Sequence, residues 1–272
     1  MRSTPVLSLL IGLTAGIAAP SAWALPTAEL TSSASGSYDF TLGAKSGNLA
    51  ISESDATGAP SLVTGNKNGY GFDAMAAVND TALSAYASTA YHPAGNAGSG
   101  ASGANAVASL TDFITFSGGA GMGSASLTAL LTGTLTGNNF GSAGYDLSIA
   151  LYDVTEQGTG YSLSNPLMLA ADTRNIAGRQ LVTVNDSFVS DFDFEYGKTY
   201  GLVATFTAHA ANGGVADFAN TTSFALAAAP TVTLSSAAGI NYGIAAAVSE
   251  PESYAMLLAG IGLMGLIARR RS

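Results

Sequence analysis

The chain has 272 residues and no cysteine, so one large or two small domains fit, while disulfide bonds, cysteine-ligated metals and a cysteine nucleophile are excluded. Only 10% of the residues are charged, and the formal net charge is −9. Four of the nine basic residues, Arg2, Arg269, Arg270 and Arg271, lie near the ends of the chain. The other five lie within residues 25–247, together with sixteen acidic residues, so this body has a net charge of −11. A surface of that charge repels phosphate backbones, which excludes nucleic acid as a partner.

The N-terminal segment has the three parts of a secretory signal peptide. Arg2 supplies a positive charge, residues 6–19 form an apolar stretch, and Ala22 and Ala24 occupy the small-residue positions of a cleavage site. We therefore expect the secretion machinery to export the chain and residues 1–24 to be removed. The alternative is a buried N-terminal helix, which would not account for this order of charge, apolar stretch and cleavage site.

Residues 25–247 have the pattern of an all-β protein. Apolar and polar residues alternate with period two, and turn residues interrupt them at fairly even spacing. This pattern predicts a single β-sandwich of jelly-roll type. Residues 74–90 fit a helix or a strand, and 93–105 are predicted to be a loop. Strands are expected over residues 36–42, 48–52, 110–116, 124–136, 145–154, 179–184, 221–227 and 231–235.

The clearest alternation lies between residues 188 and 207. Aromatic residues alternate there with Asp191, Asp193 and Glu195, and a turn follows at Gly197. The pattern predicts a hairpin with an aromatic inner face and an acidic outer face. Carboxylates about 7 Å apart along one strand are a candidate calcium site. The alternative is a solvated face that protects the sheet from pairing with other strands.

Catalytic signatures are absent from the sequence. The two histidines, His92 and His209, form no recognised motif, and the carboxylates Asp146 and Asp153 flank a strand in the manner of solvated side chains. The sequence therefore predicts a protein that is not an enzyme and needs no cofactor. Sugar-stacking aromatics would have to be tyrosines, because the one tryptophan lies in the signal peptide; the candidates are Tyr70, Tyr86, Tyr91, Tyr161 and Tyr242.

The C-terminal segment ends on an apolar run followed by three arginines. Residues 254–268 carry no charge and would span roughly 22 Å as a helix, somewhat less than the roughly 30 Å hydrocarbon core of a bilayer. Arg269, Arg270 and Arg271 should stop the transfer of the chain and hold their end of the run in the cytoplasm. These features predict a single transmembrane helix in the inner membrane, with the body on the outer side.

In order and spacing, Val248, Ser249, Glu250 and Pro251, together with the apolar run and the arginine cluster, resemble the PEP-CTERM sorting signal of Gram-negative bacteria. In that family the motif is Pro-Glu-Pro, so Ser249 stands where the first proline would be. The resemblance covers residues 248–272 and implies that exosortase, a membrane-embedded cysteine transpeptidase-like enzyme, removes the tail and releases or attaches the body at the cell surface. The alternatives are a plain C-terminal anchor and a buried helix.

Two functions remain open at this point. The first is an exported structural or interaction protein of the cell surface or extracellular matrix, for which the resemblance implies a link to exopolysaccharide and biofilm. The second is a carbohydrate-binding module or a glycan-directed enzyme on the same β-sandwich. A row of aromatic side chains on a sheet face, or two carboxylates across a cleft, would favour the second.

Overall fold

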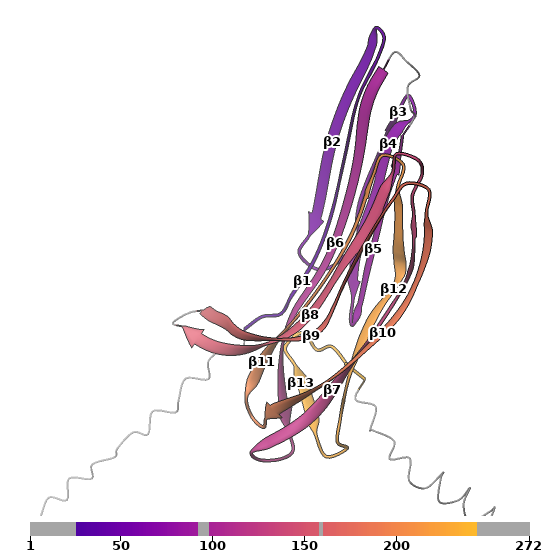
Figure 1. The fold of residues 1–272 in the computed structure, drawn as a ribbon. Helices are drawn as coiled ribbons and strands as arrows, with labels where there is room; N and C mark the ends of the chain where they lie inside the picture. Colours follow the sequence, from indigo (N-terminus) through magenta and orange to yellow (C-terminus); the bar gives the residue numbers. More distant parts are fainter. Residues whose placement is uncertain (1–25, 92–97, 158–159, 244–272) are drawn as a thin grey trace, which may run out of the picture.

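The computed structural model describes residues 26–91, 98–157 and 160–243, which form thirteen strands in two antiparallel sheets (Figure 1). The seven-stranded sheet contains β1 (Glu29–Leu42), β2 (Lys45–Asp55), β6 (Gly98–Ser117), β8 (Ser142–Gln157), β9 (Gly160–Ala177), β11 (Thr199–Ala211) and β13 (Thr233–Ser236). The six-stranded sheet contains β3 (Ser61–Lys67), β4 (Tyr70–Asn79), β5 (Ala82–Ala90), β7 (Met122–Thr136), β10 (Leu181–Glu195) and β12 (Val215–Ala228).

The strand order shows how the chain alternates between the two sheets. In the seven-stranded sheet the order is β2-β1-β6-β11-β8-β9, and β13 pairs with the far end of β6. In the six-stranded sheet the order is β10-β7-β12-β5-β4-β3. From β9 to β13 every connection passes from one sheet to the other. The predicted all-β sandwich is confirmed, whereas the more specific jelly-roll description remains an interpretation of these crossings.

The predicted hairpin at residues 188–207 is wrong. β10 pairs with β7 in one sheet, and β11 pairs with β6 and β8 in the other. The two faces were predicted correctly, since Phe192 and Phe194 are buried while Asp191, Asp193 and Glu195 are exposed. The turn at Gly197, which has a φ of 81°, therefore carries the chain across the core and does not join two paired strands.

Four other stretches differ from the expectation or resolve an ambiguity in it. Residues 98–105, part of the stretch 93–105 that was predicted to be a loop, form the first part of β6, because their backbone pairs with β1. Residues 74–90 are β4 and β5, which form a hairpin around Asp80, and not a helix. The strands β3 and β9 were not predicted.

The core combines alanine-rich strands with clusters of aromatic rings. Alternate alanines of β4, β5, β6 and β11 are buried between the sheets. At one end of the sandwich the rings of Phe40 and Tyr70 stack with centroids 5.3 Å apart, and at the other end Phe116 and Phe194 stack at 4.0 Å. Small alanine side chains and larger leucine, isoleucine and aromatic side chains thus fill the space between the sheets together, as close packing of a core requires.

Candidate functional site

A buried carboxylate fixes the segment that leads to the C-terminal tail. Asp112 on β6 is fully buried and accepts hydrogen bonds from the hydroxyls of Ser236 and Tyr242, both at 2.6 Å, and from the backbone N–H of Ala238 at 2.9 Å. Its fourth donor is the N–H of Phe113 at 2.8 Å. Burial, together with the hydrogen bond to this carboxylate, raises the pKa of Tyr242 far above its usual value.

The two ends of the chain lie outside the described residues. This applies to the cleavage-site residues Ala22 and Ala24, to the motif 248–251, to the run 254–268, and to the arginines Arg269, Arg270 and Arg271. Within the three described ranges, no helix has the length and apolar character needed to cross a membrane. The signal peptide, the transmembrane helix and the orienting role of the three arginines therefore remain predictions. Because Asp112 fixes Tyr242, the folded body extends almost to the tail.

The acidic row of β10 lies where the alternation placed it. Asp191, Asp193 and Glu195 are exposed on an edge strand, opposite Ser126, Ser124 and Met122 of β7. Among the described residues, no group of three or more His, Asp or Glu side chains could hold a metal ion. The geometry agrees with a solvated face that protects an edge strand, and the calcium site stays an untested prediction.

His209 belongs to a small polar cluster on the outer face of the seven-stranded sheet. Its Nε2 lies 2.7 Å from Oδ1 of Asn175, and its Nδ1 lies 3.9 Å from Asp146. The His209 ring has room because residue 144 is a glycine: a Cβ there would lie 2.5 Å from the ring. His92, the other candidate histidine, lies outside the described residues. The cluster contains no serine nucleophile and forms a cross-strand hydrogen-bond network.

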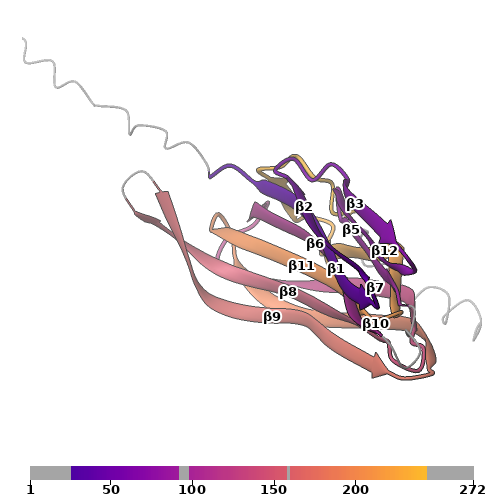
Figure 2. The same cartoon turned by 90° about the horizontal axis from the view of Figure 1, so that it is seen from above.

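Asp153 has a structural role at the β8–β9 hairpin. Its carboxylate lies 2.5 Å from Nζ of Lys198 and 3.0 Å from the amide nitrogen of Asn165. These hydrogen bonds lower the pKa of Asp153. The register of β8 against β9 shifts on either side of Leu151, and the hairpin runs past the end of the neighbouring strands (Figure 2). Asp146 and Asp153 therefore make separate contacts and do not form a carboxylate pair.

Most of the tyrosine candidates for sugar stacking are unsuitable. Tyr70 is 0% exposed and Tyr242 is 2% exposed, so both belong to the core. Tyr91 packs edge-on against Tyr70, with ring centroids 5.6 Å apart. Tyr161 packs against Phe113 on β6 at 4.4 Å and covers that ring on the outer side of the sheet. Only Tyr86, half-buried on β5, has no ring partner in the described part of the chain.

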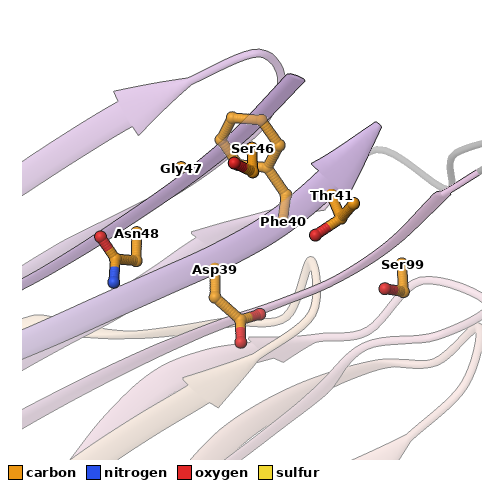
Figure 3. Close-up of a pocket in the computed structure, with 7 residues that line it drawn as sticks. All are labelled: Asp39, Phe40, Thr41, Ser46, Gly47, Asn48 and Ser99. Carbon is orange, nitrogen blue, oxygen red and sulfur yellow. The ribbon is translucent and has the colours of Figure 1, made fainter. Parts of the chain in front are cut away.

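A polar trough is a surface depression that the sequence did not predict. Three adjoining hollows lie on the outer face of β1, between β2 and β6; the middle hollow shares Asp39 and Asn48 with one neighbour and Ser37 and Ala50 with the other. The hollow at one end has a volume of about 310 Å³. Figure 3 shows this hollow, with the Phe40 ring turned away from the Asp39 carboxylate. One Asp39 oxygen accepts a hydrogen bond from the N–H of Ala101 at 3.0 Å.

The trough continues as a row of polar residues across the sheet. The registers place Ser52 of β2, Ser35 of β1, Asn105 of β6 and His209 of β11 side by side, and Asn175 of β9 completes the row beyond Gly144. Neighbouring strands lie about 4.8 Å apart, so these groups present hydrogen-bond donors and acceptors at regular spacing. None of these five residues is a lysine or an arginine. Such a surface suits a neutral, hydroxyl-rich polymer better than an anionic one.

The described residues thus define an all-β sandwich with an acidic surface and a firmly attached C-terminal segment. Residues 247–271, which follow this segment, match the family model of the PEP-CTERM protein-sorting motif. The chain therefore carries a PEP-CTERM sorting signal, which marks an exported protein that is anchored in a membrane before exosortase processes it. No curated protein matches the sequence.

Proposed function

We propose that this chain is a non-catalytic protein of the cell surface or extracellular matrix. In this proposal the signal peptide directs export, the C-terminal helix holds the body transiently at the inner membrane, and exosortase then transfers it to the cell surface, where it associates with exopolysaccharide. The observation that carries the proposal is the match of residues 247–271 to the sorting motif.

The attachment of the C-terminal segment supports this order of events. Tyr242 is bonded to Asp112, and only residues 244–246 lie between the described body and the matched segment. The body can therefore complete its fold without the tail and keep that fold after the tail is removed. Asp112 and Asp153 are each held by several hydrogen bonds within the fold, which supports a structural role for these two carboxylates.

Substitution of the motif tests the sorting step. We expect a chain with Glu250→Ala and Pro251→Ala to keep its tail and remain in the membrane fraction, because the processing enzyme has lost the residues that it reads. Immunoblotting with a tag inserted before residue 244 would follow the size and location of the body. Glu252→Ala, with the same loss of charge next to the motif, is the matched control and should be processed normally. Normal processing of the double variant would contradict the proposal.

The polar trough favours a second candidate function, a carbohydrate-binding module on the same scaffold. Its lining is rich in serine and asparagine, which bind sugar hydroxyls, and the body's charge of −11 disfavours anionic polymers. We expect binding to immobilised neutral glucan, mannan or xylan, weakened at least fivefold by Asn105→Ala. Thr183→Ala on β10, on the outer face of the other sheet, is the control. Binding to none of the three polymers would rule this candidate out.

A further inference from the structure

Three of the four sheet edges carry features that block pairing with another strand. In the described part of the chain, the seven-stranded sheet ends in β2 and β9, and the six-stranded sheet ends in β10 and β3. β9 contains Pro166 and two register shifts, and β10 carries Asp191, Asp193 and Glu195. β3 has only seven residues and ends in Lys67. Proline, irregularity, charge and short length are the usual means by which proteins protect an edge.

β2 is the exception among these edges. It has eleven residues, and its backbone pairs with β1 on one side only (Figure 1). Residues 46–52 contain no charge and no proline, and most side chains of the strand are exposed. Ile51 is 39% exposed, and Leu49 packs partly against the core. The free edge of this strand is therefore a regular, uncharged row of backbone donors and acceptors.

The residues of β2 are also complementary to those of a second β2 that runs antiparallel. If Ala50 lies opposite Ala50 of the second copy, Leu49 meets Ile51 and Lys45 meets Asp55 on the same face of the sheet. Glu53 of the second copy then lies diagonal to Lys45. Two-fold symmetry repeats each of these pairs, and cross-strand apolar and opposite-charge pairs stabilise antiparallel ladders. No charge on β2 meets a like charge in this register.

We propose that β2 is an interaction surface for a second copy of this chain, and that the two strands form an antiparallel ladder centred on Ala50. The contact joins the seven-stranded sheets of the two copies into one continuous sheet. It leaves the six-stranded sheet and the segment before the tail exposed. The inference does not depend on the ligand of the body or on the processing of the tail.

Sedimentation equilibrium of the full chain, in detergent whose density is matched by the solvent, tests the proposal. We expect a dimer that dissociates on dilution, with a dissociation constant raised about tenfold by Lys45→Glu, which places like charges opposite each other at both ends of the ladder. Ile51→Lys should raise it further. Arg179→Glu, the same charge change in the exposed turn before β10, should have no effect. A monomer at every concentration up to about 100 µM would overturn the proposal.

A single cysteine tests the register independently, because the chain has none of its own. Residues opposite each other in an antiparallel ladder have Cα atoms about 4.5–5.5 Å apart, within the range that a disulfide spans. We therefore expect Ala50→Cys to form a covalent dimer on mild oxidation, and Ser187→Cys on β10 to remain monomeric. A dimer that resists Ile51→Lys and does not crosslink through residue 50 would place the contact elsewhere, for example between the C-terminal helices, and overturn the proposal.

Discussion

At the scale of single residues, Asp112 is the side chain with the greatest structural consequence. A carboxylate without partners in the core would be strongly destabilising, yet Asp112 is fully buried and is surrounded by four hydrogen-bond donors. Three of those donors come from residues 236–242, more than 120 positions later in the chain. One carboxylate thus attaches the C-terminal segment to β6. An acid in the predicted strand 110–116 is visible in the sequence, whereas its partners are not.

Replacement of this carboxylate should cost a large share of the stability. Asp112→Asn keeps the shape but turns one oxygen into an N–H₂ group that faces donors, so we expect the free energy of unfolding to fall by about 3 kcal/mol. Urea unfolding followed by circular dichroism would measure the change. Asp191→Asn, the same substitution at an exposed position of β10, should stay within about 0.5 kcal/mol of the unchanged chain. Equal stability of the two variants would refute this role.

At the scale of elements, the sequence predicted strands better than it predicted their partners. Alternation at 124–136 and 145–154 located β7 and β8, because burial of one sheet face imposes period two on the residues themselves. Pairing depends on contacts across the core that leave no local trace, so the turn at Gly197 was interpreted as a hairpin. The Gly-rich start of β6 was missed for a related reason: its strand structure comes from β1, its neighbour, and not from its own propensity.

The two sheets can pack closely where the rings of Tyr38 and Phe72 meet only because β1 has a glycine there. A Cβ at Gly36 of β1 would lie 2.0 Å from the ring of Phe72 on β4, which is buried in the core. We expect Gly36→Ala to lower the free energy of unfolding by about 1–3 kcal/mol through overpacking. Gly103→Ala on β6 is the matched control, since its Cβ would meet nothing closer than 3.9 Å. Thermal unfolding of both variants measures the difference, and equal losses would refute the argument.

At the scale of the whole molecule, the parts that could be predicted are those encoded locally. The sorting signal is contiguous in the sequence, so residues 248–251 and the arginine cluster 269–271 identified it without a structure. The polar trough could not be found in this way. Ser35, Ser52 and Asn105 are ordinary residues in a Ser- and Asn-rich chain, and only the strand registers bring them together.

The chain between the folded body and the apolar run of the tail is short. Tyr242 is fixed to the core by Asp112, and Tyr254, where the apolar run begins, lies twelve positions later in the chain. Even a fully extended chain of this length spans at most about 40 Å. If the apolar run spans the membrane as proposed, the folded body is held close to the membrane before processing, with the motif in the short segment between them. This arrangement presents the motif to a membrane-embedded enzyme.

Mass spectrometry of both termini of the native protein, from separate membrane and medium fractions, tests the central claim most directly. The account predicts a species that begins at Leu25 and ends near Glu250, which would show that the signal peptide and the tail are both removed and that the body acts outside the cell. A species that retains Arg269, Arg270 and Arg271 and occurs only in the membrane fraction would contradict it, because the C-terminal segment would then be a permanent anchor.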